Sequence, residues 1–236
     1  MSAHYQWPIL TTSRAFVLAN AHETILNGEL VPSWARLRDM RFRQWPRLTT
    51  TRAIMTALIL MSGGVDSYAC AHFFKSQLKR SPTAFFVDYG QGAARNERKA
   101  FDRVAAALGG KTLFASLNLQ RKFGTGLIPG RNGLLIMAAL AIAPKRTSSI
   151  AIGIHSGTNY YDCSEHFLKR ADEFVQEYSN GAVRVSAPFL HWSKRQIFNY
   201  CLEKQLDLSL TYSCEKGGKP CGKCASCRDR NAFDAR

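Results

Sequence analysis

Two sets of residues have types and spacing that carry chemistry, and the first is the run Ser62–Ser67, which reads Ser-Gly-Gly-Val-Asp-Ser. It stands between an apolar stretch and a helical stretch, where free backbone N–H groups and the positive end of a helix favour a bound anion. The two glycines allow the backbone to approach a phosphate closely, because a Cβ atom would intrude. The run lacks the lysine of a Walker loop and the third glycine of a dinucleotide fingerprint. We therefore interpret it as a phosphate-binding loop of another type, with a plain glycine turn capped by serine as the alternative.

The second set consists of four cysteines near the C-terminus, with six, two and two residues between successive members: Cys214, Cys221, Cys224 and Cys227. Four thiolates at this spacing are typical of a closed tetrahedral Zn²⁺ site, which leaves no position for a substrate. We therefore predict a structural zinc ion. An iron–sulfur cluster uses the same four ligands, and free thiols or disulfides are the remaining alternative. Basic residues of the same segment can offset the negative charge of such a centre: Lys216, Lys219, Lys223, Arg228 and Arg230.

The composition is that of a globular chain, with 46% hydrophobic and 21% charged residues among 236. It excludes a disordered or collagen-like chain, and no apolar run approaches the roughly 18 residues of a membrane span. The 32 Lys and Arg residues exceed the 17 Asp and Glu residues, which gives a formal charge of +15. This charge attracts nucleic acid or an acidic protein partner, although solubility and counter-charge for a bound anion explain it equally well. Cysteines at C-x-x-C spacing without a secretory signal lead us to expect a reducing compartment, the cytoplasm.

Apolar runs and helical periods alternate along the chain and position both sets. Five strands are predicted at 57–61, 84–87, 111–116, 149–154 and 183–186. Helices are predicted at 68–79, 95–108, 129–143, 165–178 and 194–204. The alternation predicts an α/β fold, with a doubly wound, mostly parallel sheet and helices on both faces. Ligands of such sheets bind at the carboxyl ends of the strands, where the run Ser62–Ser67 also falls.

The pattern divides the chain into an α/β nucleotide-binding domain, residues 55–205, and a zinc-binding segment packed on it, residues 206–236. Residues 1–54 differ, because they contain seven Arg, no Lys and no sustained period of either kind. Three interpretations stand for this extension: sequence upstream of a true start at Met55, an organelle presequence, or an added binding arm. The position of Met55 directly before the first strand favours the first interpretation.

The run Ser62–Ser67 resembles the pyrophosphate (PP) loop of the ATP pyrophosphatases, and further motifs narrow the resemblance. Together with the cysteines, the motifs at 58–67, 87–91, 129–132, 211–214 and 221–228 look like those of the 7-cyano-7-deazaguanine synthase (QueC) family. The resemblance covers residues 55–236 and implies an adenine nucleotide alpha hydrolase-like fold. It also implies an ATP-dependent ligase that adenylates the carboxylate of 7-carboxy-7-deazaguanine, forms the amide with ammonia, and uses a second ATP to form the nitrile. We accordingly expect ATP and Mg²⁺ besides structural zinc, and a homodimer.

Residues that match the family's motifs receive candidate roles from the resemblance. The candidate catalytic residues are Ser62, Asp66, Ser67, Arg131 and Lys194. The candidate nucleotide-binding residues are Ser62, Gly63, Gly64, Val65, Asp66, Ser67, Asp88 and Gln91. The candidate substrate-binding residues are Arg131, Asn132, Tyr160 and Asp162. The alternatives are an ordinary surface lysine for Lys194, an ion pair with Asp88 or Asp162 for Arg131, and a turn cap for Asp88.

Three positions depart from the family's pattern in the segment expected to recognise the base. Ser156, Tyr161 and Ser164 stand where the family has Asp, Pro and Arg. Adenylation is therefore better supported than the identity of the base. The alternatives are a related enzyme that couples a deazapurine to a protein in antiphage defence, a tRNA-modifying enzyme of the same superfamily, and a zinc-ribbon nucleic-acid-binding protein.

Three further residues of the same region receive structural interpretations. Cys163 is interpreted as a small buried residue rather than a nucleophile, because no histidine partner follows from the sequence. His155 and His166 are interpreted as polar groups rather than metal ligands, since the four cysteines already complete a site.

Overall fold

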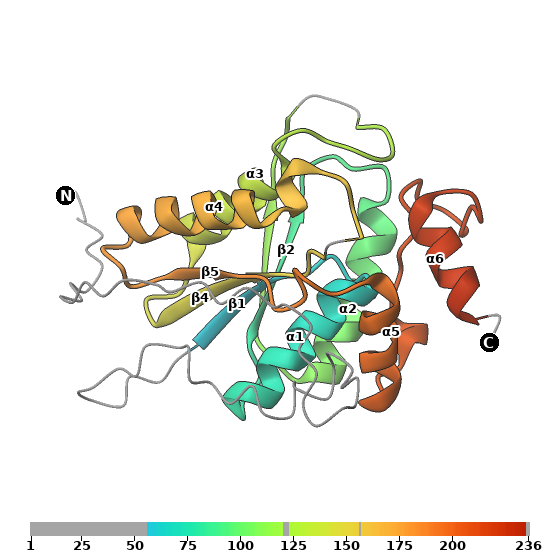
Figure 1. The fold of residues 1–236 in the computed structure, drawn as a ribbon, viewed down its shortest axis with the longest axis horizontal. Coiled ribbons are helices and arrows are strands. Elements are labelled where there is room, and N and C mark those ends of the chain that lie inside the picture. The colour runs from blue at the N-terminus through green and yellow to red at the C-terminus, as the bar shows by residue number, and fades with distance from the viewer. Residues whose placement is uncertain (1–55, 120–122, 156, 235–236) are drawn as a thin grey trace, which may run out of the picture. The chain divides into compact units, whose positions relative to one another are not determined.

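The computed structural model describes residues 56–119, 123–155 and 157–234, which form a five-stranded sheet covered by helices (Figure 1). All neighbouring strands are parallel, in the order β3-β2-β1-β4-β5. The strands are β1 (Thr56–Leu60), β2 (Thr83–Asp88), β3 (Thr112–Ser116), β4 (Thr147–Ile152) and β5 (Arg184–Ser186). The parallel α/β fold expected from the sequence is confirmed. The predictions for residues 1–54 and for Ser156 lie outside the described residues.

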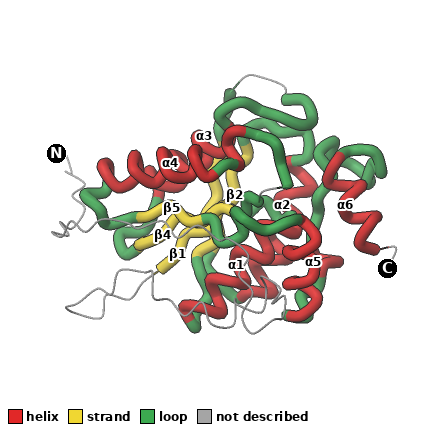
Figure 2. The backbone as a smooth tube through the Cα atoms, in the orientation of Figure 1, coloured by secondary structure: helices red, strands yellow, loops and turns green. Residues whose placement is uncertain are grey.

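The helices cover the sheet in two layers (Figure 2). One layer consists of α1 (Val65–Leu78), α2 (Ala94–Leu108) and α5 (Lys194–Glu203). The other consists of α3 (Arg131–Ile142) and α4 (Glu165–Tyr178). A further helix, α6 (Ala225–Asp234), follows the last cysteine motif and packs on α5, where the rings of Phe198 and Phe233 stack with centroids 4.2 Å apart.

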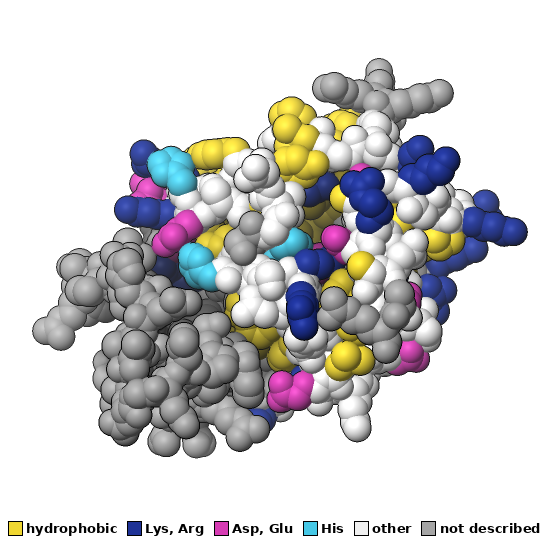
Figure 3. All heavy atoms as spheres, turned by 45° about the vertical axis from the view of Figure 1, so that its right-hand side comes forward, with side chains coloured by type: hydrophobic (Ala, Val, Ile, Leu, Met, Phe, Trp, Pro, Cys, Tyr) yellow, Lys and Arg dark blue, Asp and Glu magenta, His cyan; other side chains and the backbone are white. Residues whose placement is uncertain are grey.

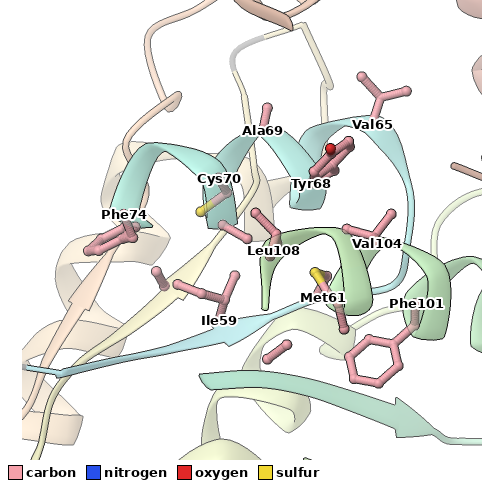
Figure 4. Packing of buried hydrophobic residues seen from close by; sticks show 14 of the residues in the cluster. Ile59, Met61, Val65, Tyr68, Ala69, Cys70, Phe74, Phe101, Val104 and Leu108 are labelled. Carbon is pink, nitrogen blue, oxygen red and sulfur yellow. The ribbon is translucent and has the colours of Figure 1, made fainter. Parts of the chain in front are cut away.

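The side chains of β1 alternate between the two layers. Ala57 and Ile59 belong to the hydrophobic cluster of α1, α2 and α5, and Figure 4 shows Ile59 packed beneath α1. Leu58 and Leu60 belong to the cluster of α3 and α4. A strand covered on both faces needs apolar residues at every position, which explains the continuous apolar run 57–61.

The strand order places a topological switch point between β1 and β4. From β1 the chain proceeds to β2 and β3 on one side, and β4 then lies on the other side of β1. Connections that leave the carboxyl ends of β1 and β4 toward opposite layers open a crevice between them. The run Ser62–Ser67 follows β1, and Gly153 and His155 follow β4, so this crevice receives residues from both.

The predicted elements agree with the structure to within three residues at their ends. Helix α1 begins at Val65, three residues before its predicted start, because the glycine loop runs directly into the helix. Helix α6 was not predicted, since its sequence is hydrophilic and lacks an apolar period. No helix in the described part of the chain is both long and apolar enough to cross a membrane.

Candidate active site

The loop Ser62–Gly64 connects β1 to the N-terminus of α1. Gly63 has a φ of +82°, and a Cβ atom there would lie 2.5 Å from the backbone nitrogen of Phe101 in α2. Only glycine therefore allows this approach of the loop to α2. Ser67 Oγ donates to the carbonyl of Gly64 at 3.0 Å, and Ser62 Oγ accepts the N–H of Gly64 at 3.3 Å. These contacts fix the loop at the positive end of a helix, an arrangement that favours a phosphate.

A cavity of about 210 Å³ opens at the carboxyl ends of β1, β2 and β4. It brings together candidate residues from three separate motifs: Ser62, Gly64, Asp66, Ser67, Gln91, Arg131 and Asn132. Gly63 and Val65 do not line the cavity, because Gly63 is buried against α2 and the Val65 side chain packs in the core. Asp88 does not line it either, and its Oδ1 caps the turn after β2 by accepting the N–H of Gly90 at 3.0 Å.

Asp66 and Lys194 form an ion pair at the mouth of the loop. Lys194 Nζ lies 2.6 Å from both carboxylate oxygens of Asp66, although the two residues are 128 positions apart in the sequence. Asp66 lies in the first turn of α1, and Lys194 is the first residue of α5. Lys194 is thus anchored at the predicted phosphate site rather than free on the surface.

His155 completes this group. Its Nε2 lies 3.9 Å from Asp66 Oδ2, and its Nδ1 accepts the N–H of Gly157 at 3.0 Å. Because Nδ1 is the acceptor, the neutral ring carries its proton on Nε2, toward the carboxylate. Burial lowers the pKa of His155 and the charge of Lys194 lowers it further, while Asp66 and Asp229 act in the opposite direction. The ring is therefore neutral at neutral pH.

The start of α3 forms another part of the cavity wall. Gly130 has a φ of +76° and turns the chain into the helix, whose first residues are Arg131 and Asn132. Arg131 Nε donates to Asn132 Oδ1 at 3.3 Å. Neither ion pair considered for Arg131, with Asp88 or with Asp162, forms among the described residues.

Asn132 connects this turn to the segment that departs from the family pattern. Its Nδ2 donates to the carbonyl of Asp162 at 2.8 Å, and its backbone N–H donates to Asp162 Oδ2 at 3.2 Å. Asp162 Oδ1 is buried and has no hydrogen-bond partner within the described residues. The two segments predicted to bind the substrate are therefore adjacent.

Tyr160 lies at a different cavity. It lines a space of about 410 Å³ with Tyr161, Cys163 and neighbouring residues. Burial raises the pKa of Cys163 to about 11, with a further contribution from Asp162, so the thiol is protonated at neutral pH. This agrees with a buried residue rather than a nucleophile.

Tyr89, Glu97 and the site role of His155 were not predicted from the sequence. Tyr89 and Glu97 line the first cavity, and burial raises the pKa of both. Glu97 follows shortly after the motif that ends at Gln91, and this position in the sequence could have indicated that it lies near the site. His155 offered none, because its place depends on the fold of the turn at Gly157.

The four cysteines form one cluster, with all sulfur atoms within 4.8 Å of one another. The sulfur atoms of Cys221 and Cys227 are 3.9 Å apart, close to the roughly 3.8 Å edge of a tetrahedron with Zn–S bonds of about 2.3 Å. Backbone N–H groups of Lys223 and Cys224 lower the pKa of Cys221 to about 6, whereas burial raises that of Cys227 to about 12. A bound cation deprotonates such a thiol. The cluster therefore fits a metal ion.

The cysteine segment also contacts the glycine loop and α2. The backbone N–H of Tyr212 donates to the carbonyl of Gly63 at 3.0 Å. Asn96 Nδ2 of α2 donates to the carbonyl of Gly218 at 2.8 Å. A metal bound by the cysteines would therefore stabilise a segment that contacts the glycine loop through this hydrogen bond to Gly63.

Basic side chains are numerous on the face shown in Figure 3, as expected from the charge of +15. Some basic side chains of the described residues are paired, and one example is Arg98, whose Nε lies 3.0 Å from Asp102 Oδ1. The acidic or nucleic-acid partner expected from the net charge stays a prediction.

The sequence model of the family described as queuosine biosynthesis protein QueC matches residues 56–126 and 119–235 of the chain. The chain belongs to the QueC family. The 7-cyano-7-deazaguanine synthase of Campylobacter concisus is 31% identical to it, over 75% of this chain and 93% of the relative. The synthase of the same name from Prochlorococcus marinus is 30% identical, over 75% of this chain and 91% of the relative.

The fold of this QueC-family chain is similar to that of the U34-tRNA thiolase NcsA from Methanococcus maripaludis, solved with its 4Fe–4S cluster. The TM-score is 0.50 at 15% identity, over 80% of this chain and 67% of the thiolase. At this identity the similarity concerns the fold alone. Membership in the QueC family makes the chain an enzyme, so the non-enzymatic zinc-ribbon interpretation is set aside. The tRNA-modifying and antiphage alternatives, the homodimer and the cytoplasmic location stay predictions.

Proposed function

We propose that the chain is an ATP-dependent ligase that converts 7-carboxy-7-deazaguanine and ammonia into 7-cyano-7-deazaguanine. One observation, together with the family, carries this proposal: the glycine loop and the Arg131–Asn132 turn line the same cavity. The first is suited to the phosphates of ATP and the second to a carboxylate. A carboxylate beside an ATP phosphate is the arrangement that adenylation requires.

The nucleotide is proposed to bind with its phosphates at the loop. Backbone N–H groups of residues 63–67 and the hydroxyls of Ser62 and Ser67 would hold the pyrophosphate, and Mg²⁺ would arrive with ATP. The Asp66 carboxylate holds the Lys194 ammonium beside the loop, where a cation stabilises the charge that develops on the leaving pyrophosphate. Asp88, the last residue of β2, and Gln91, which follows this strand, are proposed to lie toward the nucleoside.

The second substrate is proposed to place its carboxylate at Arg131. A guanidinium can bind a carboxylate through two parallel hydrogen bonds and so orient one oxygen toward the α-phosphate. Asn132, Tyr160 and Asp162 are proposed to recognise the deazaguanine base. Ammonia then displaces AMP from the adenylate to give the amide. A second ATP activates the amide oxygen, and loss of AMP leaves the nitrile.

The cysteine cluster is proposed to hold zinc through Cys214, Cys221, Cys224 and Cys227. Four thiolates close the coordination sphere, so the ion would stabilise the fold rather than activate a substrate. Through the contact of Tyr212 with Gly63, the stabilised segment would support the phosphate loop.

Mass spectrometry of the reaction products tests the proposed function. The protein is incubated with ATP, ammonium and 7-carboxy-7-deazaguanine, and in parallel with ATP and the corresponding amide. We expect the nitrile from both, with two AMP per nitrile from the acid and one from the amide. Absence of AMP and pyrophosphate in both reactions would refute the ligase proposal. If AMP formed only with a different carboxylate, the proposed adenylation would stand, but deazaguanine as the base of the substrate would be refuted.

A further inference from the structure

Glu97 is a carboxylate in the cavity that makes no ion pair among the described residues. It lies in the first turn of α2 and lines the cavity together with Ser62 and the Arg131–Asn132 turn. Its position is therefore close to both proposed substrates. Phosphate and carboxylate are both anions, so a carboxylate of the protein beside them does not favour the binding of either.

Gln91 fixes one side of this carboxylate. Gln91 Nε2 donates to Glu97 Oε2 at 2.8 Å and to the carbonyl of Val87 at 3.2 Å. Gln91 Oε1 accepts the N–H of Tyr89 at 2.9 Å. The amide cannot turn without losing these hydrogen bonds, so Oε2 is held in place. Glu97 Oε1 has no hydrogen-bond partner in the described part of the chain, and this oxygen is available to a ligand.

The surroundings of Glu97 make it a better base than a solvated carboxylate. Burial raises its pKa and the charge of Asp88 acts in the same direction, while the hydrogen bond from Gln91 and the charge of Arg131 act against them. A carboxylate with a raised pKa accepts a proton more readily at neutral pH. Tyr89, the neighbouring titratable group, also has a raised pKa because of burial, so it is protonated and accepts no proton.

The other titratable groups near the reacting centre are already engaged. The lone pair of His155 Nδ1 receives the N–H of Gly157, and both oxygens of Asp66 receive Lys194. Cys163 lines the second cavity. Glu97 is thus the one carboxylate of the cavity, within the described residues, whose second oxygen has no partner.

We propose that Glu97 accepts the protons that nitrogen loses during amide and nitrile formation, with Gln91 as its positioning residue. This role rests on the proposed ligase function. In the amide step a C–N bond forms between ammonia and the adenylate carbon, and the C–O bond to AMP breaks with its electron pair going to AMP. One nitrogen proton passes to Glu97 and from there to solvent. In the nitrile step the adenylated amide loses two nitrogen protons, one after the other, as the second C–O bond breaks and the triple bond forms.

The variant Glu97→Gln keeps the shape of the side chain and an oxygen for Gln91, but it cannot accept a proton. Three rates are measured: pyrophosphate–ATP exchange dependent on 7-carboxy-7-deazaguanine, hydroxamate formation with hydroxylamine, and amide formation with ammonia. Exchange requires only reversible formation of the adenylate and involves no nitrogen nucleophile. Hydroxylamine is less basic than ammonia, so its nitrogen loses a proton more readily after attack and depends less on a base. We expect amide formation to fall by about 10²- to 10⁴-fold and the other two rates to stay within about threefold of wild type. Glu177→Gln, on the exposed side of α4, is the matched control and should leave all three rates unchanged.

Two outcomes of the Glu97→Gln experiment would count against the role of Glu97. An equal fall of all three rates would make Glu97 a binding or structural residue, and an unchanged rate with ammonia would make it dispensable. Glu97→Asp keeps a base at shorter reach, so it should retain part of the ammonia-dependent rate that Glu97→Gln loses. Wild-type protein without substrate-dependent exchange would refute the proposed function itself, and the role of Glu97 would fall with it.

Discussion

Replacement of Gly63 by alanine tests whether the glycine loop is held against α2 as the structure shows. In the variant Gly63→Ala the added Cβ atom would lie 2.5 Å from the backbone nitrogen of Phe101 and 2.8 Å from the carbonyl carbon of Ala100. These are backbone atoms of a helix, so they cannot move aside as a flexible side chain does. The φ of +82° adds a second cost, because an L-residue with a side chain rarely adopts it.

The two costs differ in origin and can be separated by a control. A left-handed backbone costs about 1–2 kcal/mol for a residue with a Cβ atom, and overpacking of a tight contact costs about 1–3 kcal/mol. For Gly63→Ala the free energy of unfolding should therefore fall by about 2–5 kcal/mol. Gly181 has a similar φ of +76°, but a Cβ atom added there would have open space within 4 Å. Gly181→Ala should therefore cost only the backbone share, about 1–2 kcal/mol.

Urea denaturation of the wild type and both variants measures the difference. The expected result is a clearly larger loss for Gly63→Ala than for Gly181→Ala, accompanied by loss of pyrophosphate–ATP exchange in Gly63→Ala alone. Equal losses of stability in the two variants would mean that the loop does not pack on α2 in this way.

Three further perturbations address the ion pair, the metal and the buried histidine. Lys194→Met should lower pyrophosphate–ATP exchange by about 10²- to 10³-fold, because the cation at the loop is lost. Lys204→Met, at the exposed residue that caps the C-terminus of the same helix, is the control. Equal activity of both variants would remove Lys194 from the site. The purified protein should contain about one zinc per chain by elemental analysis. Cys224→Ser should lower both the zinc content and the melting temperature, because the free energy of metal binding contributes to the free energy of folding. Iron in the purified protein, with visible absorbance, would contradict the zinc prediction. His155 has a pKa below its unfolded value of 6.5, so the unfolded chain binds more protons and the free energy of unfolding should fall as the pH drops through about 6.5. Urea titrations at about pH 7.5 and about pH 5.5 should show a smaller loss for His155→Gln than for wild type, and identical losses would mean that His155 is not buried in its neutral form.

The elements of the fold could be predicted because their signals are local. Both faces of β1 are covered, so its residues form an unbroken apolar run, and the glycine loop that follows marks where helix α1 begins. Helix α6 carried no such signal, because its residues are mostly polar and only Cys227 is buried. The four cysteines compensated for this, since their spacing alone predicted the cluster that the structure shows.

The site was predictable to the extent that its residues lie in contiguous motifs. The loop at Ser62 and the turn at Arg131 each appear as a short pattern, and strand order explains why they meet at one cavity. The contact between Asp66 and Lys194 joins residues 128 positions apart and depends on the packing of α5 against α1. Glu97 depends in turn on the helical register of α2 and on the amide of Gln91. Such contacts arise from tertiary packing, which a single sequence does not encode as a pattern.

Isotope transfer from the substrate carboxylate tests the central claim, that the cavity adenylates a carboxylate and then its amide. The protein is incubated with ATP, ammonium and 7-carboxy-7-deazaguanine that carries ¹⁸O at both carboxylate oxygens, and AMP and nitrile are analysed by mass spectrometry. If both steps proceed through adenylates, each oxygen leaves with AMP, so two AMP molecules with one label each are expected per unlabelled nitrile. Unlabelled AMP, or label found in inorganic phosphate or pyrophosphate, would contradict the account.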